Sequence, residues 1–61
     1  MLPDFDIFDI FEKFPDGSMI WRACVLGQFE AERKLQALAE HSKNEFVVID
    51  IHTGYREPVI A

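Results

Sequence analysis

Few residues of this chain could do nucleophilic or acid–base chemistry, and three of them fall in its apolar segments. Cys24, His52 and Asp50 could meet on one face of a sheet, where a thiolate–imidazole pair would act as a nucleophile. No glycine-rich loop, nucleophile elbow or set of oxyanion donors accompanies them. A single cysteine in a strand is typical of a small buried hydrophobe. We therefore predict no enzyme, and keep catalysis or metal binding through these three residues as a distant alternative.

Residues with metal-ligand spacing are equally sparse. The pair Asp50-x-His52 places two ligands on one strand face, with Glu12 as a neighbouring candidate, but a divalent ion needs more protein ligands held in geometry. One Cys and two His cannot form a tetrahedral zinc set. His41 suits the end of a helix, where its charge complements the helix dipole. We predict neither a metal nor another cofactor.

The charge pattern argues against nucleic acid and membrane partners. The formal net charge is −5, and the one basic pair, Arg33-Lys34, is flanked by Glu30 and Glu32 as on a solvated helix face. The apolar start of the chain is interrupted by Asp residues, unlike a secretory signal, and no segment has the length of a membrane span. We expect a cytoplasmic protein.

The length limits the core. We expect 61 residues to form a single small domain over residues 1–61, with 1–6 loosely ordered or in a helical turn. A chain of this size buries only about 60% of the surface that its unfolded form exposes. A lone cysteine allows no disulfide within the chain. A second subunit is then the remaining stabilising device, and the 49% hydrophobic composition permits it.

The strongest local signal is a turn at residues 14–18, Phe-Pro-Asp-Gly-Ser. Proline presets φ for a type I turn, and Gly17 accepts the positive φ that closes a three-residue hairpin loop. The apolar segments 8–14 and 19–26 flank this turn and are predicted to be its strands. The first segment also shows helical spacing, but its β-branched and aromatic residues favour a strand.

One helix and two further strands follow. Gly27 can cap a helix over 28–42, whose apolar face is Ala31, Leu35, Leu38, Ala39 and Ser42, and Asn44 is a candidate for the left-handed residue after it. Residues 45–52 are rich in strand formers, and 55–61 form a fourth strand that Pro58 restricts to an edge. The prediction is an α+β fold, β-β-α-β-β, with one helix packed on one face of a four-stranded antiparallel sheet in the strand order 2-1-3-4.

Two motifs resemble a group of short bacterial hypothetical proteins. The segment 11–22, FEKFPDGSMIWR, is similar to an "FEKLPDG…WR" hairpin in that group, which precedes a Gly-led helix and an "NEF" strand; residues 44–46 here read Asn-Glu-Phe. The resemblance covers roughly residues 8–61 and implies a shared small fold. It implies no activity and transfers no site residue.

Alternation along the strands then assigns two faces. A three-residue loop pairs Phe11 with Trp21, and we expect the helix to cover their face, together with Met19, Ala23, Val25, Val47, Ile49 and Ile51. The opposite face would remain apolar and uncovered, which usually marks an interaction site. Its interface candidates are Phe8, Ile10, Phe14, Ile20, Arg22, Phe46, Val48, Asp50 and His52, with Cys24 and Glu12 on the same face.

The predicted function is that of a non-catalytic structural or protein-interaction module, a homodimer that associates through this apolar face. The alternative is a monomeric accessory protein that binds another protein by the same face or by an edge strand. A slip of the strand register by one residue would exchange the two faces.

Overall fold

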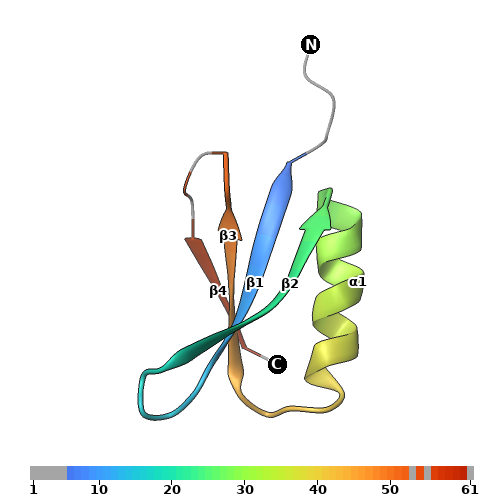
Figure 1. The fold of residues 1–61 in the computed structure, drawn as a ribbon. Coiled ribbons are helices and arrows are strands. Elements are labelled where there is room, and N and C mark those ends of the chain that lie inside the picture. Colours follow the sequence, from blue (N-terminus) through green and yellow to red (C-terminus); the bar gives the residue numbers. More distant parts are fainter. Residues whose placement is uncertain (1–5, 53, 55, 61) are drawn as a thin grey trace.

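The computed structural model describes residues 6–52, 54 and 56–60, with only the backbone course of 56–60 (Figure 1). Five elements follow one another along the chain: β1 (Ile7–Lys13), β2 (Met19–Leu26), α1 (Gln28–Ala39), β3 (Glu45–Asp50) and β4 (Arg56–Ile60). The expected loose segment 1–6 lies outside the described residues apart from residue 6, and so do the two ends of the expected fourth strand.

The β1–β2 hairpin closes as the turn sequence predicts. The N–H of Phe14 donates to the carbonyl of Ser18 at 2.8 Å, and the N–H of Gly17 donates to the carbonyl of Phe14 at 2.9 Å. Gly17 has φ 91°, a left-handed conformation in which a side chain would be strained. The Asp16 carboxylate accepts hydrogen bonds from the Ser18 N–H and hydroxyl at 2.8 and 2.7 Å. These local bonds define the loop, so the hairpin prediction is confirmed.

A β-bulge interrupts the hairpin ladder beyond its middle. Phe11 pairs with Trp21 as expected, but the next residue of β1, Ile10, pairs with Ala23, so Arg22 is the extra residue of β2. A bulge of this kind shifts the alternation of every side chain that follows it. Ala23 and Val25 therefore lie on the face of Ile10, whereas Cys24 and Leu26 lie on the face of Trp21.

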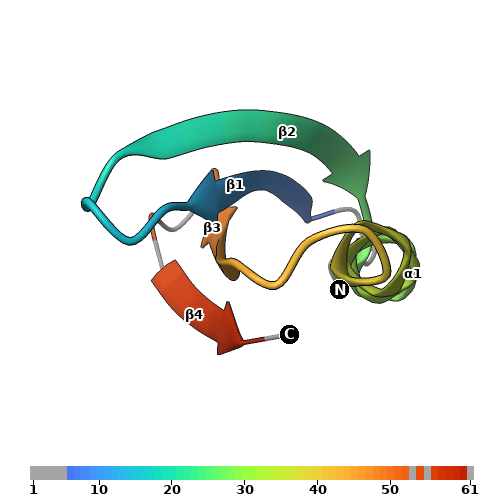
Figure 2. The same ribbon diagram turned by 90° about the horizontal axis from the view of Figure 1, so that it is seen from below.

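The strands run in the order β2-β1-β3-β4, with every neighbouring pair antiparallel, and Figure 2 shows them following one another across the twisted sheet. β1 is central because both β2 and β3 pair with it along most of its length, for example Ile10 with Val48. β4 adds to the outer side of β3 and contains Pro58 opposite Val47, which agrees with the expected edge position.

The packing of the helix corrects the fold prediction. We expected the helix to cover one face of a four-stranded sheet, but α1 packs mainly on β2 and β1, and the buried cluster involves α1 and the strands β2, β1 and β3. The unit packed by the described side chains is a three-stranded antiparallel sheet, β2-β1-β3, with one helix, and the backbone of β4 pairs with the outer side of β3. The reason is size, because a helix about 10 Å wide covers roughly two strands spaced about 4.8 Å apart.

The helix begins after Gly27, which has φ 89° and accepts a hydrogen bond from the Ala31 N–H at 3.1 Å. Glu30 makes no cap hydrogen bond and instead pairs with Arg33 at 3.3 Å. The helix ends at Ala39, three residues before the expected end at Ser42. The expected left-handed Asn44 is also wrong, because no described residue other than glycine has a positive φ. Polar contacts of Ser42 and Asn44, described below, replace the last helical turn.

The core shows that the two sheet faces were assigned the wrong way round. Ile10 and Phe46 are 0% and 1% exposed and form the buried cluster with Val48. The partly buried residues packed on this cluster are Phe8, Val25, Leu35 and Leu38. The helix therefore covers the face that was expected to be uncovered. The bulge is one cause, because it adds Ala23 and Val25 to the side of Ile10.

The third strand ends at Asp50, two residues before the expected end at His52. The Gly54 N–H donates to the Asp50 carbonyl at 2.6 Å, and the Ile51 N–H donates to the Ile7 carbonyl at 2.9 Å. The Asp50 carboxylate accepts the His52 N–H at 2.9 Å. These bonds turn the chain toward β4, so Ile51 and His52 belong to the turn.

Candidate functional site

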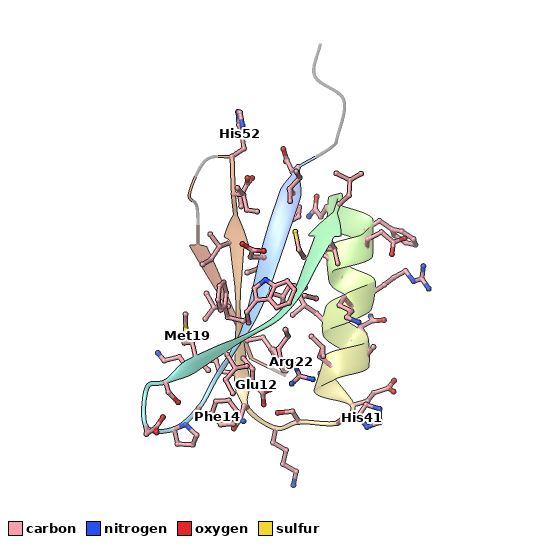
Figure 3. All side chains as sticks on the ribbon, viewed as in Figure 1. Glu12, Phe14, Met19, Arg22, His41 and His52 are labelled. Carbon is pink, nitrogen blue, oxygen red and sulfur yellow. The ribbon has the colours of Figure 1, made fainter. Side chains whose placement is uncertain are left out.

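The face of the sheet away from α1 carries three of the large apolar side chains that the described part of the chain exposes: Ile7, Trp21 and Leu26. We call it the open face, and its members follow from the strand register: Ile7, Asp9, Phe11, Lys13, Met19, Trp21, Cys24, Leu26, Glu45, Val47 and Ile49. In Figure 3 Met19 points to this side, whereas Glu12 and Arg22 lie on the helix side. The open face is thus mostly apolar. Its polar members are Asp9 and the ion pair of Lys13 and Glu45, whose charged atoms lie 3.9 Å apart. Val47 within this face is only 7% exposed.

Three large side chains on the open face remain in solvent. Trp21 is 55% exposed, Leu26 52% and Ile7 42%. The indole N–H of Trp21 donates to the Asp9 carboxylate at 3.1 Å, which holds the ring across the β1–β2 pair. We had expected Trp21 in the core; the structure places it on the surface because the helix covers the other face. Exposed tryptophans fixed by one polar contact are characteristic of interfaces.

The expected interface residues are not gathered on one exposed surface. Ile10, Phe46 and Val48 belong to the core, and Phe8 packs on it. Ile20 is 52% exposed near the hairpin loop, on the helix side beyond the helix. Of the remaining candidates, Phe14 is half-buried at the loop, Arg22 pairs with Glu12, and Asp50 and His52 lie at the β3–β4 turn.

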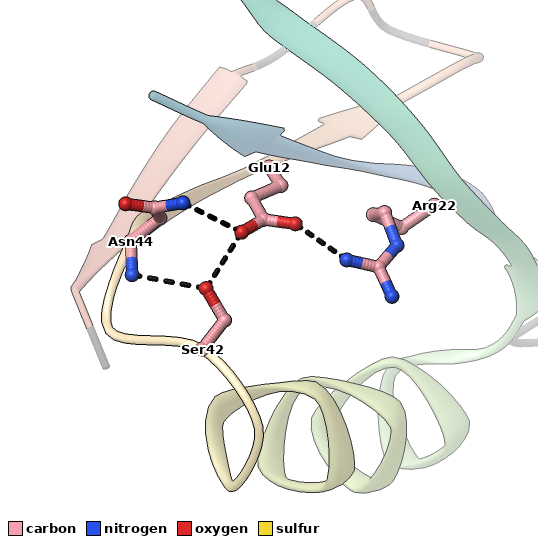
Figure 4. A network of polar contacts seen from close by, with 4 residues as sticks. All are labelled: Glu12, Arg22, Ser42 and Asn44. Atoms are coloured by element: carbon pink, nitrogen blue, oxygen red, sulfur yellow. Dashed lines mark hydrogen bonds and ion pairs between the residues drawn. The ribbon is translucent and has the colours of Figure 1, made fainter. Parts of the chain in front are cut away.

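A buried carboxylate joins the end of the helix to the sheet (Figure 4). Glu12 is 4% exposed. One carboxylate oxygen, Oε2, accepts hydrogen bonds from the Ser42 hydroxyl at 2.6 Å and from the Asn44 side-chain amide at 2.7 Å. The other, Oε1, binds the Arg22 guanidinium. The Ser42 hydroxyl in turn accepts the Asn44 N–H at 3.1 Å. We call these four residues the Glu12 cluster.

The Glu12 cluster holds an ionised carboxylate. The hydrogen bonds from Ser42 and Asn44, and then the bond and charge of Arg22, lower the pKa of Glu12 despite the opposing effect of burial. A carboxylate with a lowered pKa and its oxygens already bonded is a poor general acid, and it suits a structural role. The sequence carried one signal for it: Glu12 shares the strand parity of Ile10, so a buried position with dedicated donors could have been expected.

The residues considered for catalysis do not form a site. Cys24 pairs with Asp9 on the open face, whereas Asp50 pairs with Phe8, whose side chain packs on the core of the helix face. Desolvation, together with the hydrogen bond and charge of Asp9, raises the pKa of Cys24, which disfavours a thiolate. Among the described residues, no three His, Cys, Asp or Glu side chains form a group that could hold a metal ion.

The start of α1 borders a wide depression of about 640 Å³, lined by Asp6, Gly27, Gln28, Phe29 and Glu32. Two of these residues are acidic, which opposes the attraction of the helix start for anions. Phe29 is 70% exposed, with the Arg33 guanidinium 5.9 Å from its ring centre. It belongs to the helix and not to the open face.

Comparison of the chain with family models, with curated proteins and with solved structures gives no match. The resemblance to short bacterial proteins therefore stays a prediction. No helix in the described part of the chain combines the length and the apolar character needed to cross a membrane.

Proposed function

We propose that this chain is a non-catalytic protein-interaction module that associates with a second copy of itself through the open face. The observation that carries the proposal is the exposure of Trp21, Leu26 and Ile7 together on one side of β1 and β2. A patch of this kind on a small domain usually marks a contact surface. The surface differs from the one expected from the sequence, which lies largely under the helix.

The size of the core supports association. The buried apolar residues in the described part of the chain are few and mostly small: Ile10, Ala23, Ala31, Phe46, Val47 and Val48, of which only Ile10 and Phe46 are fully buried. A domain with such a core gains stability when a partner covers further apolar surface. The open face offers that surface without disturbing the helix side. Binding of a different protein to the same face is the alternative, and a monomer at all concentrations would favour it.

The test compares molecular mass over a wide range of concentrations, by light scattering, for the native chain and two variants. Trp21→Ser removes a large exposed side chain of the open face and should weaken the dimer by about 2 kcal/mol, or roughly thirtyfold in dissociation constant. Phe29→Ser removes an even more exposed aromatic ring from the helix and should leave the dimer unchanged. A native chain that stays monomeric, or equal weakening by both variants, would contradict the proposal.

A further inference from the structure

We propose that two copies of this chain pair along the outer edge of β2, antiparallel and related by a two-fold axis, so that their sheets become one. This proposal rests on the self-association proposed above and places the contact at the β2 edge of the open face, where Met19, Trp21, Cys24 and Leu26 stand. The first observation is the difference between the two edges of the sheet. In Figure 2 β2 runs along one outer side of the molecule, and no described strand pairs with that side.

The other edge, β4, is protected against strand addition. It contains Pro58, which has no N–H to donate, and two charged residues, Arg56 and Glu57, precede this proline in the strand. β2 is less protected: it is eight residues long, without proline or glycine, and its one charged residue, Arg22, stands at its one bulge. Natural proteins rarely leave such a strand edge unpaired unless it serves as a contact.

The alternation of hydrogen bonds identifies the amides on the outer edge. The Phe14–Ser18 bond at the loop and the Gly27–Asp6 bond at the other end fix which pairs are hydrogen-bonded to β1. Counting from these two bonds, with the bulge at Arg22 between them, four N–H groups of β2 point away from β1. They belong to Met19, Trp21, Cys24 and Leu26.

Pairing the whole of β2 with itself uses all four of these amides. Antiparallel alignment of Met19–Leu26 with its own copy sets Met19 opposite Leu26 and Trp21 opposite Cys24. These four side chains also share the open face, so the register matches both the backbone and the apolar surface. Trp21 would then pack beside Cys24, and Leu26 beside Met19, of the second copy, which covers part of each exposed side chain.

The same alignment gives the exposed Ile20 a partner on the helix side. It sets Ile20 opposite Val25 of the second copy. Val25 lines a shallow groove of about 180 Å³ beside α1, together with Glu30, Arg33, Lys34 and Ala37. The alkyl stems of Arg33 and Lys34 and the Ala37 methyl make this groove suitable for an isoleucine side chain.

Charge favours a second copy at this edge over contact elsewhere. Two chains of net charge −5 repel each other. Of the five elements, β2 alone has no acidic residue. The proposed register also keeps the two Arg22 residues from facing each other directly, since Arg22 stands opposite Ala23 of the second copy.

Hydrogen exchange of the native chain, resolved by residue at low and high protein concentration, tests this geometry. The Trp21 and Cys24 amides should exchange freely in the monomer and slow by about tenfold or more as the mass doubles. The amides of Ile20 and Val25, which point to β1, should be protected at both concentrations. A dimer whose Trp21 and Cys24 amides stay unprotected would overturn edge pairing and leave the proposed function intact; a monomer throughout would overturn both.

A matched pair of variants gives an independent readout. Cys24→Pro removes an outward N–H without removing a bond to β1, and should shift the chain to a folded monomer. Cys24→Ala keeps that N–H and should remain a dimer. Equal dimer affinity of the two variants would overturn the proposal. If Cys24→Pro does not fold, the hydrogen-exchange measurement on the native chain tests edge pairing instead.

Discussion

Glu12 shows how one residue can fix the relative position of distant segments. Its carboxylate contacts Arg22 from the neighbouring strand, and Ser42 and Asn44 from the segment between α1 and β3. The sequence predicts a longer helix here because Ser42 continues the apolar face of the helix. It could not show that a buried carboxylate would bind Ser42 and Asn44 more favourably than another helical turn would.

The lowered pKa of Glu12 predicts a specific dependence of stability on pH. A carboxyl whose pKa is lower in the folded state stabilises the fold fully above its unfolded pKa of about 4.3, and this contribution is lost as the pH falls through the folded value. Glu12→Gln should therefore lower the urea midpoint at neutral pH, and the difference from the native chain should shrink toward about pH 3.

Hydrogen bonds from Ser18 also lower the pKa of Asp16, which adds its own pH dependence of stability. Comparison of the variant with the native chain at each pH cancels the contribution of Asp16 and leaves that of Glu12. Glu32→Gln, on the exposed surface of α1, serves as the control and should leave the midpoint nearly unchanged. A midpoint difference for Glu12→Gln that is the same at both pH values would argue against a stabilising ionised carboxylate.

At the scale of elements, local sequence signals predicted the hairpin correctly. They did not predict toward which face of the sheet the side chains of β2 point. The hairpin register followed from Pro15 and Gly17 because turn geometry is set by neighbouring residues. The bulge at Arg22 has no such local signal. It depends on Arg22 reaching Glu12 while Ala23 turns toward the helix, and both conditions arise only in the folded molecule.

The position of α1 over β1, β2 and β3 can be tested with a charge in β3. Val48→Asp places a carboxylate in the cluster of Ile10 and Phe46, where an unpaired charge costs about 3–5 kcal/mol, as much as a domain of this size has in total. The variant should be unfolded by circular dichroism. Ile51→Asp, at a position that is 50% exposed, should remain folded. A folded Val48→Asp variant would support the original assignment of the faces.

At the scale of the whole molecule, the choice of covered face could not be derived from composition. Both faces of the sheet are largely apolar, so alternation alone gave two possible placements of the helix. The choice depends on the summed packing of α1 against each face, including the small residues Ala23 and Ala31, which are both buried. The sequence did predict that the helix would leave one apolar face of the sheet uncovered, and the proposed function is self-association through that face.

The emission spectrum of Trp21, the one tryptophan of the chain, tests the central claim most directly when it is recorded over a wide range of concentrations. At high dilution the 55% exposed indole should emit at the long wavelengths of a solvated tryptophan. As the dimer forms and the second copy packs against Trp21 at the β2 edge of the open face, the emission should move to shorter wavelength in step with the molecular mass. Emission that is already at short wavelength at the greatest dilution, or that does not change while the mass doubles, would contradict the account.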